Sequence, residues 1–389
     1  MIALAGVSGP AMALILALII DLAFGELPNA LHPVVWMGKA TALLDRLAPK
    51  DGRALQVLYG AMDEIFDFSV NTNPYGPSPE MTSALAAAPV DRYPDVTGTS
   101  AREALGAALG VPPGAIALGA GAADLLWTIA RVLIRPGDRV AVPEPTFCEF
   151  RAAAVSCGAQ IAELRTEAAN GFAIELGALM ATRPRIVYLC APNTPTGAAI
   201  AVDEISTVAA RFPDVLIVLD QSFLSMSERW ADAKVAVPDN VVRIRSLTKD
   251  HAVPGVRVGY VLAASTIVEA IEHTRPAWST STAAQAAVHV ACRSDAFVRE
   301  GREMWLADRR WLQGALAGIG LPTVPTTTGF FLVEVGDAVG VRRRLLEHVR
   351  ILVRDATSFA LPRHVRICAR PRAQSERLVA ALARVRDGA

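Results

Sequence analysis

Two features are missing from this sequence, and each absence limits the classes of function that it can have. There is no charge excess, because Lys and Arg together number 38, as do Asp and Glu. A basic nucleic-acid-binding surface is therefore not indicated, although a few placed arginines can still hold a small anion. The 5 cysteines are scattered, with neither a CxxC pair nor a Cys/His cluster of zinc spacing. This pattern favours buried thiols in a reducing cytoplasm.

The chain is rich in apolar residues and lacks repeats or low-complexity linkers. Its 389 residues are 52% hydrophobic and 20% charged. Disorder is excluded for most of the chain, and the length suits one large α/β unit with a satellite domain, or about two to three domains.

Short apolar runs alternate with segments of helical length from about residue 115 onward. Several runs are apolar on both faces, which is typical of parallel strands covered by helices on each side. We therefore predict an α/β fold with a mostly parallel central sheet. The runs cover residues 115–119, 139–145, 185–193, 215–221, 241–247 and 258–263.

The texture changes beyond about residue 310. Strand-like runs at 329–335, 350–355 and 364–370 alternate with basic helices, and an amphipathic helix closes the chain. This pattern predicts a smaller α+β domain. The predicted organisation is an apolar segment at 1–50, an amino-terminal arm and large domain at 63–310, and a small domain at 311–389.

The segment SLTKDHAVPGVRVGY, residues 246–260, contains the sharpest chemical pattern. We expect a strand to end in a loop that contains Lys249, with Ser246 and Arg257 flanking one anion. An arginine and a hydroxyl can hold a phosphate together, and a desolvated lysine beside cations can attack carbonyl carbons. On spacing alone, however, an ordinary solvated lysine remains an open alternative.

Other segments end strands or begin a helix where open α/β sheets bind ligands. Asp220 closes an apolar run and suits a cationic partner such as a protonated pyridinium nitrogen, or else it caps the next turn. Small residues at 119–123 open a helix whose amino-terminal N–H groups can face a phosphate. Phe147 follows a strand and suits a flat ring, and APNTPTG at 191–197 forms a tight turn.

Taken in order, these segments resemble the fold-type-I pyridoxal-phosphate enzymes of the class I/II aminotransferase group. The resemblance covers about residues 63–389 and implies a pyridoxal 5'-phosphate cofactor. It implies that Lys249 binds the cofactor covalently, that Asp220 pairs with its pyridine nitrogen, and that Arg366 grips a substrate carboxylate. The remaining implied cofactor contacts are Ala122, Ala123, Phe147, Asn193, Ser246, Arg257 and, from the neighbouring subunit of a homodimer, Tyr93.

The chain departs from the family pattern at three places. Thr194 stands where an asparagine usually precedes Pro-Thr-Gly, with Asn193 one place earlier. Ala122 and Ala123 replace side-chain donors in the phosphate loop. Phe223 replaces a tyrosine, which removes one hydrogen bond to the ring oxygen.

The reaction depends on which bond at Cα breaks, and the sequence does not determine it. DFSVNTNPYGPSP at 67–79 and the carboxyl-terminal VRICAR resemble L-threonine-O-3-phosphate decarboxylases, and so does Phe223. This implies Asn73 and Arg370 as further substrate contacts, and decarboxylation of O-phospho-L-threonine to (R)-1-amino-2-propanol phosphate. The alternatives are transamination of histidinol phosphate or a related amino acid, and ligand binding without turnover. Arg370 is equally consistent with a solvated basic face.

Residues 1–20 contain no charged side chain, which allows one short membrane contact. A secretory signal is disfavoured because a basic start and a cleavage site are lacking. Residues 21–46 resemble the start of adenosylcobinamide-phosphate synthases of cobalamin biosynthesis. We therefore expect a truncated membrane-synthase segment ahead of a cytoplasmic enzyme from the same pathway.

Overall fold

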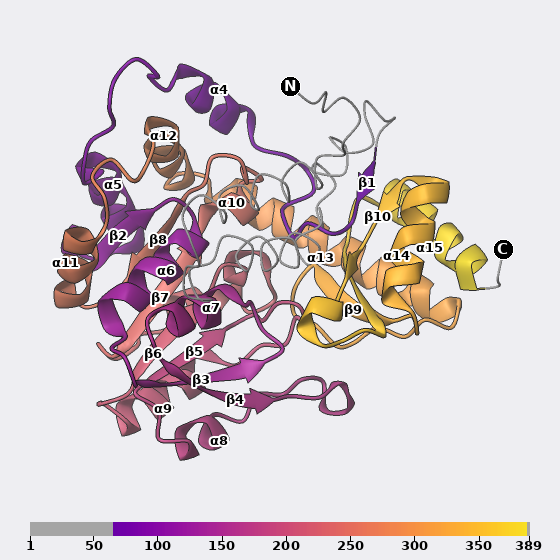
Figure 1. The fold of residues 1–389 in the computed structure, drawn as a ribbon. Coiled ribbons are helices and arrows are strands. Elements are labelled where there is room, and N and C mark those ends of the chain that lie inside the picture. The colour runs from indigo at the N-terminus through magenta and orange to yellow at the C-terminus, as the bar shows by residue number, and fades with distance from the viewer. Residues whose placement is uncertain (1–64, 387–389) are drawn as a thin grey trace, which may run out of the picture. The chain divides into compact units, whose positions relative to one another are not determined.

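The computed structural model describes residues 65–386, and Figure 1 shows their arrangement. The predictions for residues 1–50, including membrane contact, lie outside this range. No helix within residues 65–386 is long and apolar enough to cross a membrane.

A seven-stranded sheet forms the larger of the two sheet systems, in the order β2-β8-β7-β6-β5-β3-β4. Neighbours from β7 through β4 are parallel, whereas β8 runs antiparallel to both β2 and β7. The strands are β2 (Ile116–Gly119), β3 (Arg139–Glu144), β4 (Gln160–Arg165), β5 (Ile186–Cys190), β6 (Leu216–Asp220), β7 (Val241–Ser246) and β8 (Gly259–Leu262).

Both faces of this sheet are covered because alternate strand residues enter different apolar clusters. Ile186 and Tyr188 of β5 pack with α6 (Ala122–Leu133), α7 (Glu149–Ser156) and α11 (Ser265–Thr274). Val187 and Leu189 pack on the other side with α8 and α9. The helices on this second side are α4 (Pro79–Ala87), α5 (Thr99–Leu109), α8 (Leu176–Ala181), α9 (Val202–Arg211) and α12 (Thr282–Ala291).

A second, antiparallel sheet has the order β11-β12-β9, and β1 pairs with β10 beside it. Its strands and helices share one apolar core that also contains Phe223 and Met226. The elements are β1 (Phe66–Asp67), α13 (Asp295–Gly318), β9 (Phe330–Glu334), α14 (Ala338–Val349), β10 (Ile351–Leu352), β11 (Arg354–Asp355), β12 (His364–Cys368) and α15 (Arg372–Arg386). The predicted boundary at residue 310 falls inside α13, so the division into domains stays a prediction.

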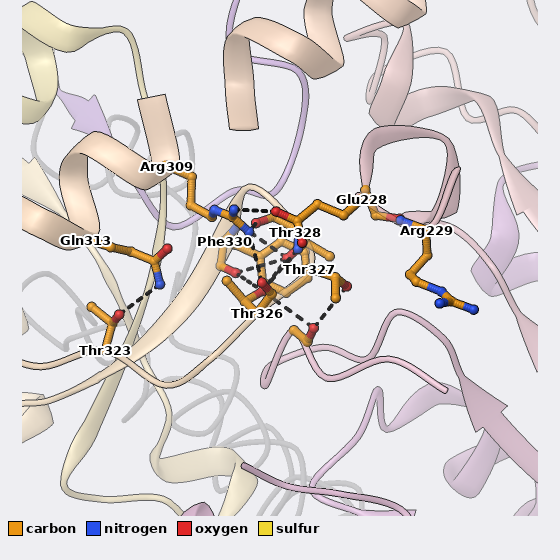
Figure 2. A network of polar contacts seen from close by, with 11 residues as sticks. Glu228, Arg229, Arg309, Gln313, Thr323, Thr326, Thr327, Thr328 and Phe330 are labelled. Carbon is orange, nitrogen blue, oxygen red and sulfur yellow. Dashed lines mark hydrogen bonds and ion pairs between the residues drawn. The ribbon is translucent and has the colours of Figure 1, made fainter. Parts of the chain in front are cut away.

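A polar network joins the two sheet systems (Figure 2). Arg309 of α13, whose side chain is 5% exposed, donates to the carbonyl of Thr326 at 2.9 Å and to the carboxylate of Glu228 at 2.6 Å. The backbone of Thr327 bonds to Gly197 and to Glu228. A Cβ at Gly197 would collide with the Thr326 hydroxyl, so only glycine allows this approach. The network fixes the second sheet against the carboxyl edge of the first.

Candidate active site

Lys249 lies just beyond the carboxyl end of β7. The sequence indicates a loop here, whereas the structure has one helical turn, α10 (Leu247–Asp250). Burial, together with the nearby guanidinium groups of Arg257 and Arg366, lowers the pKa of Lys249 to about 8. Its Nζ is 5.8 Å from the ring centre of Phe223. A lysine with this pKa is partly neutral near neutral pH and can act as a nucleophile or base.

Asp220 ends β6 and is only 2% exposed. Its carboxylate accepts hydrogen bonds from the Tyr188 hydroxyl at 3.3 Å and from the backbone N–H of Ser222 at 2.9 Å. Burial raises its pKa, and Lys249 opposes that effect. No ion pair within 4.0 Å reaches Asp220 in the described part of the chain. A buried carboxylate in this position can stabilise a cationic ring nitrogen.

The amino terminus of α6 lies close to Arg257 and to the paired ends of β7 and β8, and we call this group of residues the cup. Gly121 precedes the helix at φ 88°, and a Cβ there would lie 2.5 Å from Nη2 of Arg257. Ser246 pairs with Gly259 across the β7–β8 ladder, and a Cβ at Gly259 would lie 3.1 Å from the backbone N of Ala122. The absence of these two Cβ atoms therefore brings Arg257, Ser246 and the helix terminus together. Such a cup suits a phosphate dianion.

Asn193 and Phe147 lie in the turns beside this cup. The Asn193 amide Nδ2 donates to the carbonyl of Pro145 at 2.8 Å and to the Thr196 hydroxyl at 2.9 Å. Its Oδ1 accepts from Thr146 at 2.6 Å. Both amide hydrogens are thus used within the chain, so Asn193 holds two turns together, and its contact with a ring hydroxyl stays a prediction. Phe147 is half-buried against the core.

Arg366 of β12 brings the second sheet into the site. Its Nη1 donates to the Thr194 hydroxyl at 2.8 Å, and its Nη2 donates to the carbonyl of Ser69 at 2.6 Å. Burial and the neighbouring Arg354 lower the pKa of Arg366 to about 10. Its buried Nε has no hydrogen-bond partner among the described residues. Thr194, noted above only as a departure from the family pattern, is therefore the turn residue that orients Arg366.

Arg354 is a neighbour of Arg366 that the sequence did not reveal. It lies opposite Arg366 in the β11–β12 register, so both side chains leave the same face of the sheet. One of its guanidinium nitrogens, Nη2, donates to Ser358 at 2.9 Å, while the buried Nη1 has no partner within residues 65–386. The register of two short strands was the missing information.

The structure gives Asn73 and Arg370 supporting positions. The backbone N–H of Asn73 donates to the carbonyl of Lys249 at 2.8 Å, and its side chain donates to the carbonyl of Asp250 at 3.0 Å. Asn73 therefore stabilises the carboxyl end of α10 through its backbone carbonyls. Arg370 donates through Nε to the backbone carbonyl of Asp67 at 2.6 Å and so braces β1.

Tyr93 stands apart from the other predicted contacts. It is 77% exposed and stacks on Trp278, with ring centroids 4.6 Å apart. Two large aromatic side chains thus stand on the surface of one chain, where they are available to a second copy.

Comparison with known proteins identifies the family. The model of the family described as aminotransferase class I and II matches residues 63–382. The chain belongs to this family.

Relatives and solved structures agree with this assignment. Histidinol-phosphate aminotransferase of Moorella thermoacetica is 30% identical over 329 residues, which cover 82% of this chain and 85% of the relative. The structure of the Sinorhizobium meliloti histidinol-phosphate aminotransferase with pyridoxal 5'-phosphate is similar at a TM-score of 0.78 and 25% identity, covering 86% of this chain and 94% of that one. L-threonine-O-3-phosphate decarboxylase of Porphyromonas gingivalis shares the fold at a TM-score of 0.75 and 24% identity, covering 83% and 100%.

This class I/II enzyme is therefore a pyridoxal-phosphate enzyme, and the predicted fold class and cofactor are confirmed. The geometry fits the cofactor on two counts. The buried Asp220 carboxylate has no paired cation among the described residues, and the close approach of Arg257 to Gly121 puts a guanidinium beside the amino terminus of α6, which suits a phosphate. When bound, the cofactor supplies an electron sink for a substrate carbon that bears an amino group.

Proposed function

We propose that this enzyme acts on a small amino compound that carries a phosphate group. The observation that supports the proposal best is that the charge of Lys249 is influenced by two separate guanidinium groups. Arg257 lies at the amino terminus of α6, and Arg366 lies on β12 with Arg354 opposite it in register. The first group suits the cofactor phosphate, and the second suits an anionic substrate.

On the cofactor side, Lys249 would bind pyridoxal 5'-phosphate covalently, and Asp220 would pair with its ring nitrogen. Lys249 Nζ, at a pKa of about 8, would also take a proton from the substrate Cα or return one. The other proposed cofactor contacts are Ala122, Ala123, Phe147, Asn193, Ser246, Arg257 and the partner subunit's Tyr93.

On the substrate side, Arg366 is the proposed carboxylate ligand, as the sequence predicts. Arg354 is proposed as a second anion ligand. Its side chain lies on the same face of the sheet as that of Arg366, and its Nη1 has no hydrogen-bond partner among the described residues. Asn73 and Arg370, which the sequence places at the substrate, bond to backbone instead. We assign Asn73 a positioning role behind Lys249.

Transamination is the reaction that the relatives favour. The Moorella thermoacetica relative is named histidinol-phosphate aminotransferase, and it matches most of both chains. Lys249 would move a proton at the substrate carbon, and 2-oxoglutarate or a similar acid would receive the amino group.

Decarboxylation of O-phospho-L-threonine is the second candidate. Phe223 is buried and packs edge-on against Phe330, 4.9 Å between ring centroids, at the position where the family pattern has a tyrosine. Arg366 and Arg354 also suit a substrate with both a carboxylate and a phosphate. The product, (R)-1-amino-2-propanol phosphate, agrees with the cobalamin-synthase resemblance of residues 21–46.

One assay separates the two reactions. Purified holoenzyme is given O-phospho-L-threonine or histidinol phosphate, with and without 2-oxoglutarate, while CO₂ and glutamate are measured. Glutamate formation that requires 2-oxoglutarate supports transamination. Carbon dioxide release without 2-oxoglutarate supports decarboxylation, and neither product from either substrate contradicts the proposed substrate class.

A homodimer is proposed from Tyr93 and Trp278. If Tyr93 completes a partner's site, Tyr93→Ala should lower cofactor affinity, and a mixture of Tyr93→Ala with Lys249→Ala chains should regain part of the activity. Absence of any recovery from mixed chains that do associate would contradict a shared site.

A further inference from the structure

A second cavity borders the helix that carries Lys249. It has a volume of about 870 Å³ and is lined by Leu247, Asp250 and His251 of α10 and its carboxyl end, together with β7, β8, α5 and the start of α13. Lys249 does not line it. The volume lies in the range of small-molecule sites.

The walls of this cavity carry more cations than anions. Arg243 and Arg245 alternate on β7 and thus face the same side of the sheet. The further lining cations are Lys234, Arg299 and Arg302, and the lining carboxylates are Asp250 and Asp295. Neither Arg243 nor Arg245 has an ion pair within 4.0 Å in the described part of the chain. We call the space bounded by these residues the arginine cavity.

Burying like charges side by side is unfavourable unless an anion compensates them. Burial lowers the pKa of both Arg243 and Arg245, and Arg245 lowers that of Arg243 further. Asp250 partly offsets this effect at Arg245, but only two carboxylates, those of Asp250 and Asp295, line the cavity with five cations. The positive charge of the arginine cavity is therefore largely uncompensated by the described residues.

Two polar nitrogens in the wall lack hydrogen-bond partners, while other side chains of the wall are held in place. The Nε atom of Arg243 and the Nδ1 atom of His251 are buried without a hydrogen-bond partner among residues 65–386. His251 itself is 2% exposed. Arg245 is held by Gln221 at 2.8 Å, and Arg302 lies over the Trp230 ring at 4.4 Å and donates to the carbonyl of Ser225 at 3.0 Å. The wall is thus a set of positioned cations with unused donors.

We infer that the arginine cavity binds a phosphorylated small molecule distinct from the substrate and the cofactor. A phosphate matches guanidinium groups by paired hydrogen bonds, and the volume admits an organic group attached to it. The site shares α10 with the active site, and Asp250 connects the two. Asp250 lines the cavity, and its backbone carbonyl accepts from the side chain of Asn73, whose backbone N–H donates to the carbonyl of Lys249.

The test uses holoenzyme, so that the cofactor occupies its own phosphate cup, and inorganic pyrophosphate as the probe. Trp230 lines the cavity, so its fluorescence reports occupancy. We expect a saturable change that is lost in Trp230→Phe. Arg243→Gln and the exposed-rim variant Arg299→Gln should each weaken the midpoint about tenfold or more, because each loses a charge-assisted hydrogen bond.

Matched variants separate this site from the active site. Arg354→Gln removes an active-site cation and should leave the fluorescence midpoint unchanged. Arg310 is an exposed arginine of α13, the helix that also carries Arg299, but it does not line the cavity. Arg310→Gln should therefore also leave the fluorescence midpoint unchanged. Absence of a saturable change, a change that persists in Trp230→Phe, or equal midpoints in a folded Arg299→Gln and the parent would each overturn the inference. These outcomes do not depend on which reaction the enzyme catalyses.

Discussion

The proposed cofactor side and the proposed substrate side of the candidate active site are built differently. The cofactor side consists of a helix terminus, a glycine approach and a buried carboxylate, all fixed by close packing. The substrate side consists of arginines on short antiparallel strands, with buried nitrogens that have no partners among the described residues. A cofactor that stays bound can be held by shape, whereas a substrate that comes and goes needs donors that are free to receive it. The experiments below test that difference.

The largest effect is expected from Lys249→Ala, which removes the covalent anchor and the proton carrier together. Activity should fall by about 10⁴-fold or more, and the absorption of the lysine–cofactor link in the visible should vanish. Lys234→Ala, at the other lysine in residues 65–386, should keep that absorption. Retention of the band in Lys249→Ala would show that another group binds the cofactor.

The next largest effect is expected at the polar network around Arg309, which joins the two sheet systems. Arg309→Met should lower the free energy of unfolding by about 2–3 kcal/mol, because the carbonyl of Thr326 and Glu228 lose a charged donor. Denaturant unfolding measures this loss. Arg310→Met, its exposed neighbour, serves as the control, and equal stabilities of the two variants would mean that the network contributes little.

On the substrate side, Arg354→Gln should raise the KM for the phosphorylated substrate about 10- to 100-fold while leaving cofactor affinity unchanged. The exposed Arg363→Gln is the control, since it pairs with Glu334 on the surface. Steady-state kinetics and cofactor titration measure the two quantities. Weaker cofactor binding with an unchanged KM would show that Arg354 belongs to the cofactor side and not to the substrate side.

On the cofactor side, Gly121→Ala should weaken cofactor binding about tenfold, since its Cβ both strains the backbone and crowds Arg257. Gly110→Ala is a matched control, because φ is also positive there (69°) but the added Cβ meets open space. Titration of the apoenzyme with the cofactor gives both affinities. Equal losses of cofactor affinity in the two variants would mean that the close approach of Gly121 to Arg257 has no specific role in cofactor binding.

The smallest effect is a pH dependence. Only the neutral form of Lys249 captures the cofactor, and its pKa of about 8 lies below the ordinary value for lysine. The capture rate in apoenzyme should therefore increase about fivefold from pH 7 to 8 and less than twofold from pH 8 to 9. Arg366→Gln should move the midpoint upward, because that guanidinium helps to lower the pKa. If the pH midpoint of cofactor capture is the same in Arg366→Gln as in the parent, then Arg366 does not influence the pKa of Lys249.

Much of the first sheet was predictable, because buried parallel strands are apolar on both faces. Each of the six predicted runs contains a strand, from β2 to β8. The strand missed was β4, whose residues are mostly half-buried or exposed at the sheet edge, so that QIAELR shows no continuous apolar run. The turn that carries Lys249 was expected as a loop, since four residues are too few to show helical periodicity.

The candidate site divides along the same line. Four candidate residues could be found from the sequence, because each lies at or next to the end of a predicted strand. They are Lys249, Asp220, Ser246 and Arg257. Arg354 and Thr194 were not, because their roles depend on which residues face each other across β11–β12 and between the two sheets.

The sequence by itself determined the α/β class, because buried parallel strands are apolar on both faces, and it carried the ordered motifs of the family resemblance, which in turn implied the cofactor. Only the tertiary structure decided that Asn193 and Asn73 support backbone, that Arg354 joins Arg366, and that five cations surround a second cavity behind α10. These features depend on register, on hydrogen-bond partners and on burial, which bring together residues far apart in the chain and leave no periodic trace in it.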